Sequence, residues 1–228
     1  MLSVTNDKGF DYVVDRFADL EILRYQVPGF ESLTLKQKQL LYHLSEAALM
    51  GRDILFDQNC RYNLPIRRTL EAIYTSYKGD RQTPDFLALE TYLKRVWFAN
   101  GIHHHYAEDK FQPGFSAEFL KKAISQLDPA LVPVRPGQSI EAFTEEICQV
   151  ILDPTVLPKR TTQSGDQDLI QASANNYYGE GLTQKEVEDF YASQKNDPTD
   201  MTPISYGLNS RLVKENCLIH TRFWASWW

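Results

Sequence analysis

Three consecutive histidines, His103, His104 and His105, are the residues of this chain whose side chains offer the widest chemistry. The chain has 5 histidines in all, so three in one run is a strong local bias. Imidazole can bind a metal, transfer a proton near neutral pH or hydrogen-bond to the backbone. Metal ligands must converge on one point, whereas neighbouring side chains diverge by roughly 100° on a helix and point to opposite faces of a strand. His103 and His105 could therefore share an ion only in an extended segment.

The alternative interpretation of the histidine run, which we favour, is a polar loop whose imidazoles hydrogen-bond to the backbone and line a surface. No cysteine lies nearby in the sequence to complete a tetrahedral zinc site. We take five residues as candidates for a polar surface: Asn100, His103, His104, His105 and Tyr106.

A helix must precede this loop, because both of its ends are marked in the sequence. Thr83, Pro84 and Asp85 supply a cap, a proline at the first helical position and an acid near the positive end of the helix dipole. Apolar residues then recur at spacings of three and four on one face. They are Phe86, Leu89, Leu93, Val96 and Trp97. Gly101 stands where helices commonly end.

Similar signals along the chain predict a mainly α fold of about six helices, with a few short β-strands at the two ends that would be part of an incomplete small β-barrel. Thr34 and Gln37 form a capping pair before an apolar face made by Leu40, Leu41, Leu44, Ala47 and Ala48. Further helix starts are predicted at Asn63, Ser116, Ser139 and Thr183. We expect an extended lead-in over residues 1–30, a helical domain over 31–200, and a strand with an atypical aromatic tail over 201–228.

Composition limits the class of protein. Hydrophobic residues make up 43% of the chain and charged residues 24%, as in ordinary globular proteins. A net charge of −6 without clustered Lys and Arg argues against nucleic acid as a partner. The three cysteines are widely spaced, which indicates reduced, structural thiols. Neither a signal peptide nor a run of 18 apolar residues is present, so we expect a soluble, cytoplasmic protein without a membrane partner. Export of a longer precursor stays open.

Several segments resemble the dipeptidyl peptidase III family of zinc metallopeptidases, especially its Bacteroides-type members. They follow the family's order from residue 15 to residue 216 and match its amino-terminal part. The segments are DRFADLEILRYQVPGF (15–30), LSEAALMGRDILFDQN (44–59), IRRTLEAIYTSYKGD (66–80), VWFANGIHHHYAEDKF (96–111), NNYYGEGLTQKEVEDF (175–190) and ISYGLNSRLVKEN (204–216).

The resemblance implies an enzyme that removes dipeptides from the free amino end of peptides, in a cleft between a zinc-holding lobe and a second lobe. The family's H-E-x-x-G-H and E-E-x-x-x-D zinc motifs are absent from this sequence. We therefore expect the non-zinc lobe alone, with no cofactor of its own, no catalytic residue and no activity by itself. Zinc and the peptide substrate belong to the complete family enzyme.

The end of the chain departs from the family. The segment from Ile204 resembles a strand of a small β-barrel, but the ending CLIHTRFWASWW does not match, and we expect the strand to lack its hairpin partner, as after an interrupted or shifted reading frame. The alternative function is a stand-alone helical binding module that self-associates through the tryptophan-rich end (Trp224, Trp227, Trp228). A third hypothesis is a metalloprotein that uses His103 and His105.

Overall fold

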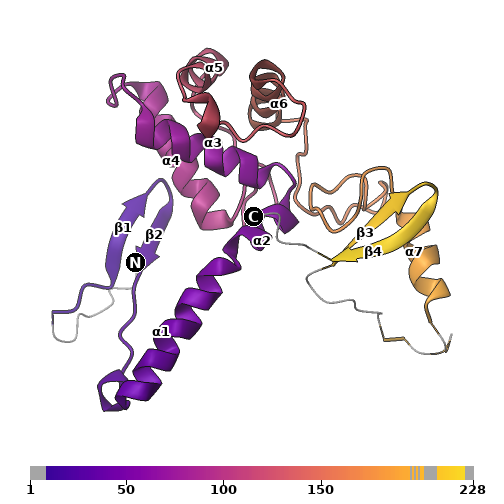
Figure 1. Cartoon of the computed structure of the whole chain (residues 1–228), viewed down its shortest axis with the longest axis horizontal. Coiled ribbons are helices and arrows are strands. Elements are labelled where there is room, and N and C mark those ends of the chain that lie inside the picture. The colour runs from indigo at the N-terminus through magenta and orange to yellow at the C-terminus, as the bar shows by residue number, and fades with distance from the viewer. Residues whose placement is uncertain (1–8, 196, 198, 200, 203–209, 224–228) are drawn as a thin grey trace. The chain divides into compact units, whose positions relative to one another are not determined.

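The computed structural model describes residues 9–195, 197, 199, 201–202 and 210–223, and their secondary structure is mainly helical with strands near the two ends (Figure 1). This confirms the predicted fold class. The helices are α1 (Leu35–Met50), α2 (Arg52–Asn59), α3 (Asn63–Ser76), α4 (Pro84–Ala99), α5 (Ala117–Ser125), α6 (Ile140–Leu152) and α7 (Gln184–Ser193). The strands are β1 (Val13–Phe17), β2 (Leu20–Leu23), β3 (Ser210–Glu215) and β4 (Leu218–Phe223). In the described part of the chain, no helix is both long enough and apolar enough to cross a membrane.

The chain divides into two compact units, Met1–Arg52 and Asp53–Trp228. The first unit contains an antiparallel hairpin, in which β1 pairs with β2, and the helix α1. A two-residue turn joins these strands, and Ala18 adopts a φ of 49° in it. The second unit contains the remaining helices and the β3–β4 hairpin. Predicted boundaries at residues 30 and 200 stay predictions.

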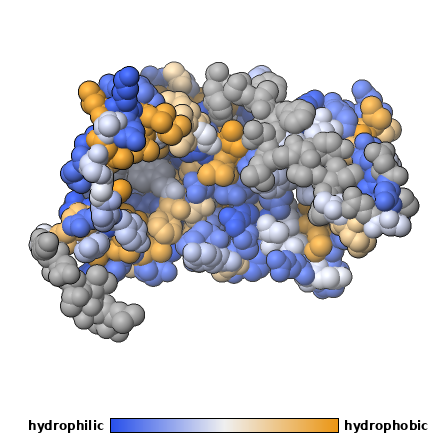
Figure 2. Space-filling model, turned by 90° about the horizontal axis from the view of Figure 1, so that it is seen from below, coloured by the Kyte–Doolittle hydropathy of each residue, from blue (hydrophilic) through white to orange (hydrophobic). Residues whose placement is uncertain are grey.

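Helix α1 begins as the sequence predicts, but its apolar stripe is not buried. Thr34 and Gln37 form the capping box, with the Thr34 N–H donating to Gln37 Oε1 at 2.9 Å. No residue of α1 is buried, and Leu40 is 57% exposed. The apolar face of α1 is therefore exposed, because such a face is covered only where another element packs on it. Figure 2 shows apolar residues, in orange, exposed among polar ones on one face of the molecule.

The core lies in the second unit, where α3 packs against α4 and α5, and α5 packs against α6. Thr83, Ser116 and Ser139 cap α4, α5 and α6 through their side-chain oxygens, as predicted. Their apolar faces meet in one cluster whose most deeply buried members include Ile66, Leu70, Leu89, Val96, Leu120 and Ile151. Each of these capped helices therefore buries its apolar face in the same core.

Strand β3 has a hairpin partner, contrary to the expectation from the sequence. β4 pairs with it in antiparallel register from Ser210 opposite Phe223 to Glu215 opposite Leu218. Asn216 and Cys217 form the two-residue turn and both have positive φ, 49° and 65°, the combination that suits the right-handed twist of a hairpin. The described strands form two separate two-stranded sheets and no closed barrel, and the three terminal tryptophans lie outside the described residues.

Candidate functional site

The loop that carries the histidines is fixed to the core at the end of α4. Asn100, rather than Gly101, takes the left-handed conformation that ends the helix, with a φ of 53°. Its backbone carbonyl accepts a hydrogen bond from Asn59 Nδ2 at 3.0 Å. A Cβ atom on Gly101 would lie 2.2 Å from Asn63 Nδ2, so only glycine fits there. Asn63 Oδ1 also accepts the Ile102 N–H at 3.1 Å.

Lys110 anchors the far end of the same loop from inside the protein. Its ammonium group is buried and donates to three backbone carbonyls, those of Val150 at 3.0 Å, Asp153, and Val156 at 2.5 Å. These carbonyls lie at and just beyond the end of α6, where helices leave acceptors unpaired. Burial lowers the pKa of Lys110, and the negative charge of Asp153 opposes that shift. The lysine therefore serves as a cap for α6.

His103 is part of the core and not of an exposed surface. Its side chain is 1% exposed, and Nε2 lies 2.9 Å from the Leu157 carbonyl, so this nitrogen carries the proton. Its Nδ1 atom is buried with no hydrogen-bond partner in the described part of the chain. Burial lowers the pKa of His103 to about 4, and the cations Lys110 and Arg160 act in the same direction, while the bond to Leu157 opposes them. The imidazole is therefore neutral in the folded protein at pH 7.

His104, His105 and Tyr106 do come together, at the outer side of the loop. The rings of His104 and His105 stack at 4.6 Å between centroids, and Tyr106 lies 4.3 Å from His105. Phe98 of α4 meets His105 edge-on at 5.0 Å. Tyr106 is 84% exposed. We call these four residues, Phe98, His104, His105 and Tyr106, the ring surface.

Backbone hydrogen bonds fix the orientation of His104 within the ring surface. Its Nδ1 atom accepts the N–H groups of Tyr106 at 3.2 Å and Ala107 at 3.0 Å. An acceptor Nδ1 leaves the proton of the neutral ring on Nε2, which is then a donor. The pKa of His105 is lowered by burial and by its neighbours His104 and Arg160. This arrangement matches the predicted loop whose imidazoles bond to the backbone.

An ion pair between Arg160 and Glu108 holds the backbone of the ring surface in place. Arg160 donates from Nε to Glu108 Oε2 at 2.7 Å and from Nη2 to Glu108 Oε1. The same Nη2 also reaches the backbone carbonyl of His105 at 3.3 Å. Hydrogen bonds from Arg160 lower the pKa of Glu108. A two-pronged pair of this kind fixes geometry as well as charge, so the loop has a defined shape.

The ring surface does not have the form of a metal centre. Within the described residues, no group of three or more His, Cys, Asp or Glu side chains could hold a metal ion. The stacked rings of His104 and His105 are 19° from parallel, and His103 Nε2 faces a carbonyl. What the arrangement offers instead is a set of partly exposed rings with hydrogen-bonding groups at their edges.

Residues 175–179 form a bend that pairs with β3. Tyr178 pairs with Leu212 in a parallel bridge, and the Gly179 N–H donates to the Leu212 carbonyl at 2.6 Å. Asn176 is buried and its N–H donates to the Gln58 carbonyl at 2.8 Å. Burial raises the pKa of nearby Asp57, which Arg211 partly offsets. No spacing in the sequence indicated that the charge of Arg211 would act on Asp57.

Comparisons with known proteins add no identification: no model of a protein family matches the chain, and no curated protein does.

Proposed function

We propose that this chain is the amino-terminal, non-zinc lobe of a dipeptidyl peptidase III-like metallopeptidase, and that its ring surface forms part of the wall of the peptide cleft. The resemblance of six segments between residues 15 and 216 supports the first part. The observation that carries the second part is the exposure of Tyr106 beside two stacked imidazoles, on a loop held by Lys110 and Arg160.

The chemistry of the ring surface suits a peptide with a free amino end. Aromatic faces attract an ammonium group, and an exposed contact of this kind contributes about 0.5–1 kcal/mol. Tyr106 and Phe98 supply such faces. Because the pKa of His105 is lowered, its imidazole adds no positive charge that would repel the ammonium at pH 7. His104 Nε2–H and the Tyr106 hydroxyl can donate to backbone carbonyls of the peptide.

In this scheme the chain binds and orients the substrate, and hydrolysis belongs to the zinc-holding lobe. We therefore assign no catalytic residue here. Lys110 and Arg160 position the ring surface. Lys110 donates its hydrogen bonds to backbone carbonyls of the protein itself, and Arg160 donates to the carboxylate of Glu108. They support the wall without touching the peptide.

A complementation assay tests the proposal. The purified chain is mixed with a separately produced zinc lobe of a Bacteroides-type family member, and release of naphthylamine from a dipeptidyl-naphthylamide is followed. We expect turnover from the mixture and none from this chain with zinc alone. Tyr106→Ala should raise KM about threefold, the equivalent of one exposed ring contact. Tyr25→Ala, which removes another exposed tyrosine, is the matched control and should leave KM unchanged.

Two outcomes would contradict the proposal. If the mixture is no more active than the zinc lobe alone, this chain is not the missing wall of that enzyme. If Tyr106→Ala and Tyr25→Ala give the same KM, the ring surface does not contact the peptide.

We propose as an alternative function a stand-alone helical interaction module, because α1 has no buried residue. Covering its leucines would remove apolar area from water at about 25 cal/mol per Å². Light scattering after size exclusion separates two routes to self-association. Leu40→Gln with Leu44→Gln should reduce the mass of an assembly built through α1. Trp227→Ser with Trp228→Ser should reduce one built through the carboxyl end, and neither change alters the mass of a monomer.

A further inference from the structure

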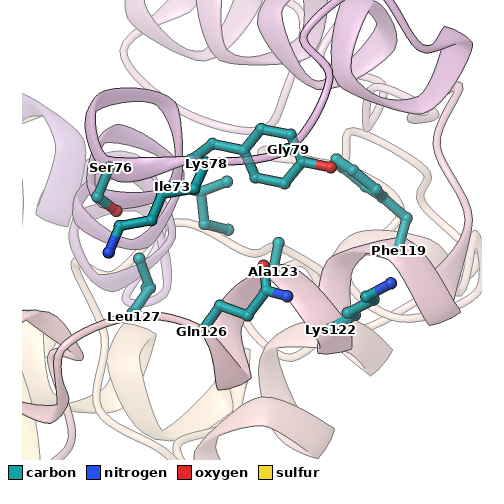
Figure 3. Close-up of a pocket in the computed structure, with 10 residues that line it drawn as sticks. Ile73, Ser76, Lys78, Gly79, Phe119, Lys122, Ala123, Gln126 and Leu127 are labelled. Atoms are coloured by element: carbon teal, nitrogen blue, oxygen red, sulfur yellow. The ribbon is translucent and has the colours of Figure 1, made fainter.

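A cavity of about 480 Å³ lies in the second unit, where the end of α3 and the residues that follow it face α5 (Figure 3). Its floor consists of apolar side chains that are themselves buried, including Ile73 and Ala123. The volume falls in the range of small-molecule sites. No residue of the ring surface lines this cavity, so the inference drawn from it is independent of the proposed cleft.

Two aromatic rings form a wall of the cavity. Tyr77 and Phe119 meet edge to face with centroids 5.9 Å apart, and Tyr77 also stacks on Phe86 at 4.8 Å. The Tyr77 ring lies across Gly79, where an added Cβ would be 2.7 Å from the ring. Glycine at position 79 therefore allows the ring to take this place. Such a wall favours a ligand with an apolar or aromatic body.

The charge around the cavity is opposite in sign to that of the chain. Lys78 and Lys122 line it, none of the lining residues is acidic, and the whole chain has a net charge of −6. Neither ammonium group has an ion-pair or hydrogen-bond partner in the described part of the chain. The adjacent Lys121, by contrast, is paired with Glu145 at 2.6 Å. Figure 3 shows the ammonium groups of Lys78 and Lys122 on opposite sides of the cavity.

We propose that this cavity binds a small organic carboxylate with an aryl or alkyl body. The body would lie over Ile73 and Ala123 beside the Tyr77 and Phe119 rings, and the carboxylate would meet Lys78 or Lys122 at the rim. Apolar burial supplies affinity, while the two cations select an acid over the corresponding neutral compound.

The experiment titrates 4-phenylbutyrate into the full chain and follows backbone amide shifts by NMR, with Gly79 and Ala123 as reporters of the cavity. The neutral comparison is 4-phenylbutyramide. We expect the acid to bind about threefold more tightly than the amide, since its carboxylate meets one of the two unpaired cations. The double variant Lys78→Gln with Lys122→Gln should lose that preference. Lys121→Gln is the matched control, because it removes a neighbouring lysine that is paired outside the cavity.

Three results would overturn the inference: equal affinity for acid and amide, an unchanged preference in the double variant, or shifts that leave Gly79 and Ala123 unmoved. Gln in place of an exposed lysine keeps the fold, so loss of structure does not confound the variants. Since the measurement is made without a zinc lobe, its failure would leave the proposed function untouched.

Discussion

Helices α1 and α4 have the same length and the same kind of N-cap, but they differ in how much of their surface is buried. Each has 16 residues and a threonine N-cap. α1 buries none of its residues, whereas α4 buries six, namely Phe86, Leu89, Tyr92, Leu93, Val96 and Ala99. Both have apolar residues at helical spacing. The difference therefore lies in what packs against each helix within its own unit.

This comparison separates two contributions to helix stability. Capping and spacing are local and mark where a helix begins and which side is apolar. Packing is not local, because α4 is buried against α3, a helix formed by a different stretch of the sequence. Isolated helices shorter than about 12–15 residues are marginal in water, and most helical stability in proteins comes from tertiary packing.

The largest expected contrast is between leucines on the two helices. Leu89→Ala empties a site that is 0% exposed and should lower the free energy of unfolding by about 3 kcal/mol through lost burial and a cavity. Leu40→Ala on α1 should change it by less than about 0.5 kcal/mol. Urea unfolding followed by circular dichroism measures both. Equal losses would mean that α1 is packed as tightly as α4.

The second contrast concerns lysines. Lys110→Met leaves three carbonyls near the end of α6 without their donor, and we expect a loss of about 3 kcal/mol or slightly less in the same assay. Lys36→Met on the exposed α1 removes the same charge and should have no measurable effect. A small effect of Lys110→Met would show that water can satisfy those carbonyls.

A pH dependence of stability should arise in the second unit from His103. Its folded pKa of about 4 lies below the ordinary histidine value of 6.5, so the unfolded chain takes up the proton first as the pH falls. The stabilisation is complete above the unfolded pKa and is lost on acidification toward the folded one. Between pH 7.5 and 5 the loss should be about 2 kcal/mol. Urea midpoints of the parent and of His103→Asn test this, and an equally steep loss in the variant would exclude His103 as the cause.

The smallest effect, about 1 kcal/mol, concerns the two caps. Thr83→Ala should lower the urea midpoint while leaving the helical signal at 222 nm unchanged, because the core still holds α4. Thr34→Ala should do the reverse, reducing the helical signal without moving the midpoint, because α1 has no core contacts to compensate. If both variants shift the midpoint alike, the unfolding of α1 is coupled to that of the second unit.

Much of the architecture followed from short-range patterns. The capping boxes at Thr34 and Thr183 and the N-cap at Thr83 are all present. The strand β4 escaped prediction because its turn, Asn216 and Cys217, lacks the glycine that usually marks a two-residue hairpin loop.

The candidate site was predicted in part. The sequence indicated a loop in which imidazoles bond to the backbone, and His104 does so twice. It could not separate His103, which enters the core, from His105 and Tyr106, which stay outside. That separation depends on Leu157, 54 positions away, whose carbonyl meets the His103 ring.

The sequence by itself determined where helices begin, which sides are apolar, and that three imidazoles share one loop, because these properties depend on residues within a few positions of one another. Only the tertiary structure decided which apolar side is covered, which histidine is neutral in the core, and that two lysines flank a cavity between α3 and α5. Burial and pKa depend on groups far along the chain, and no local pattern encodes which of them will meet.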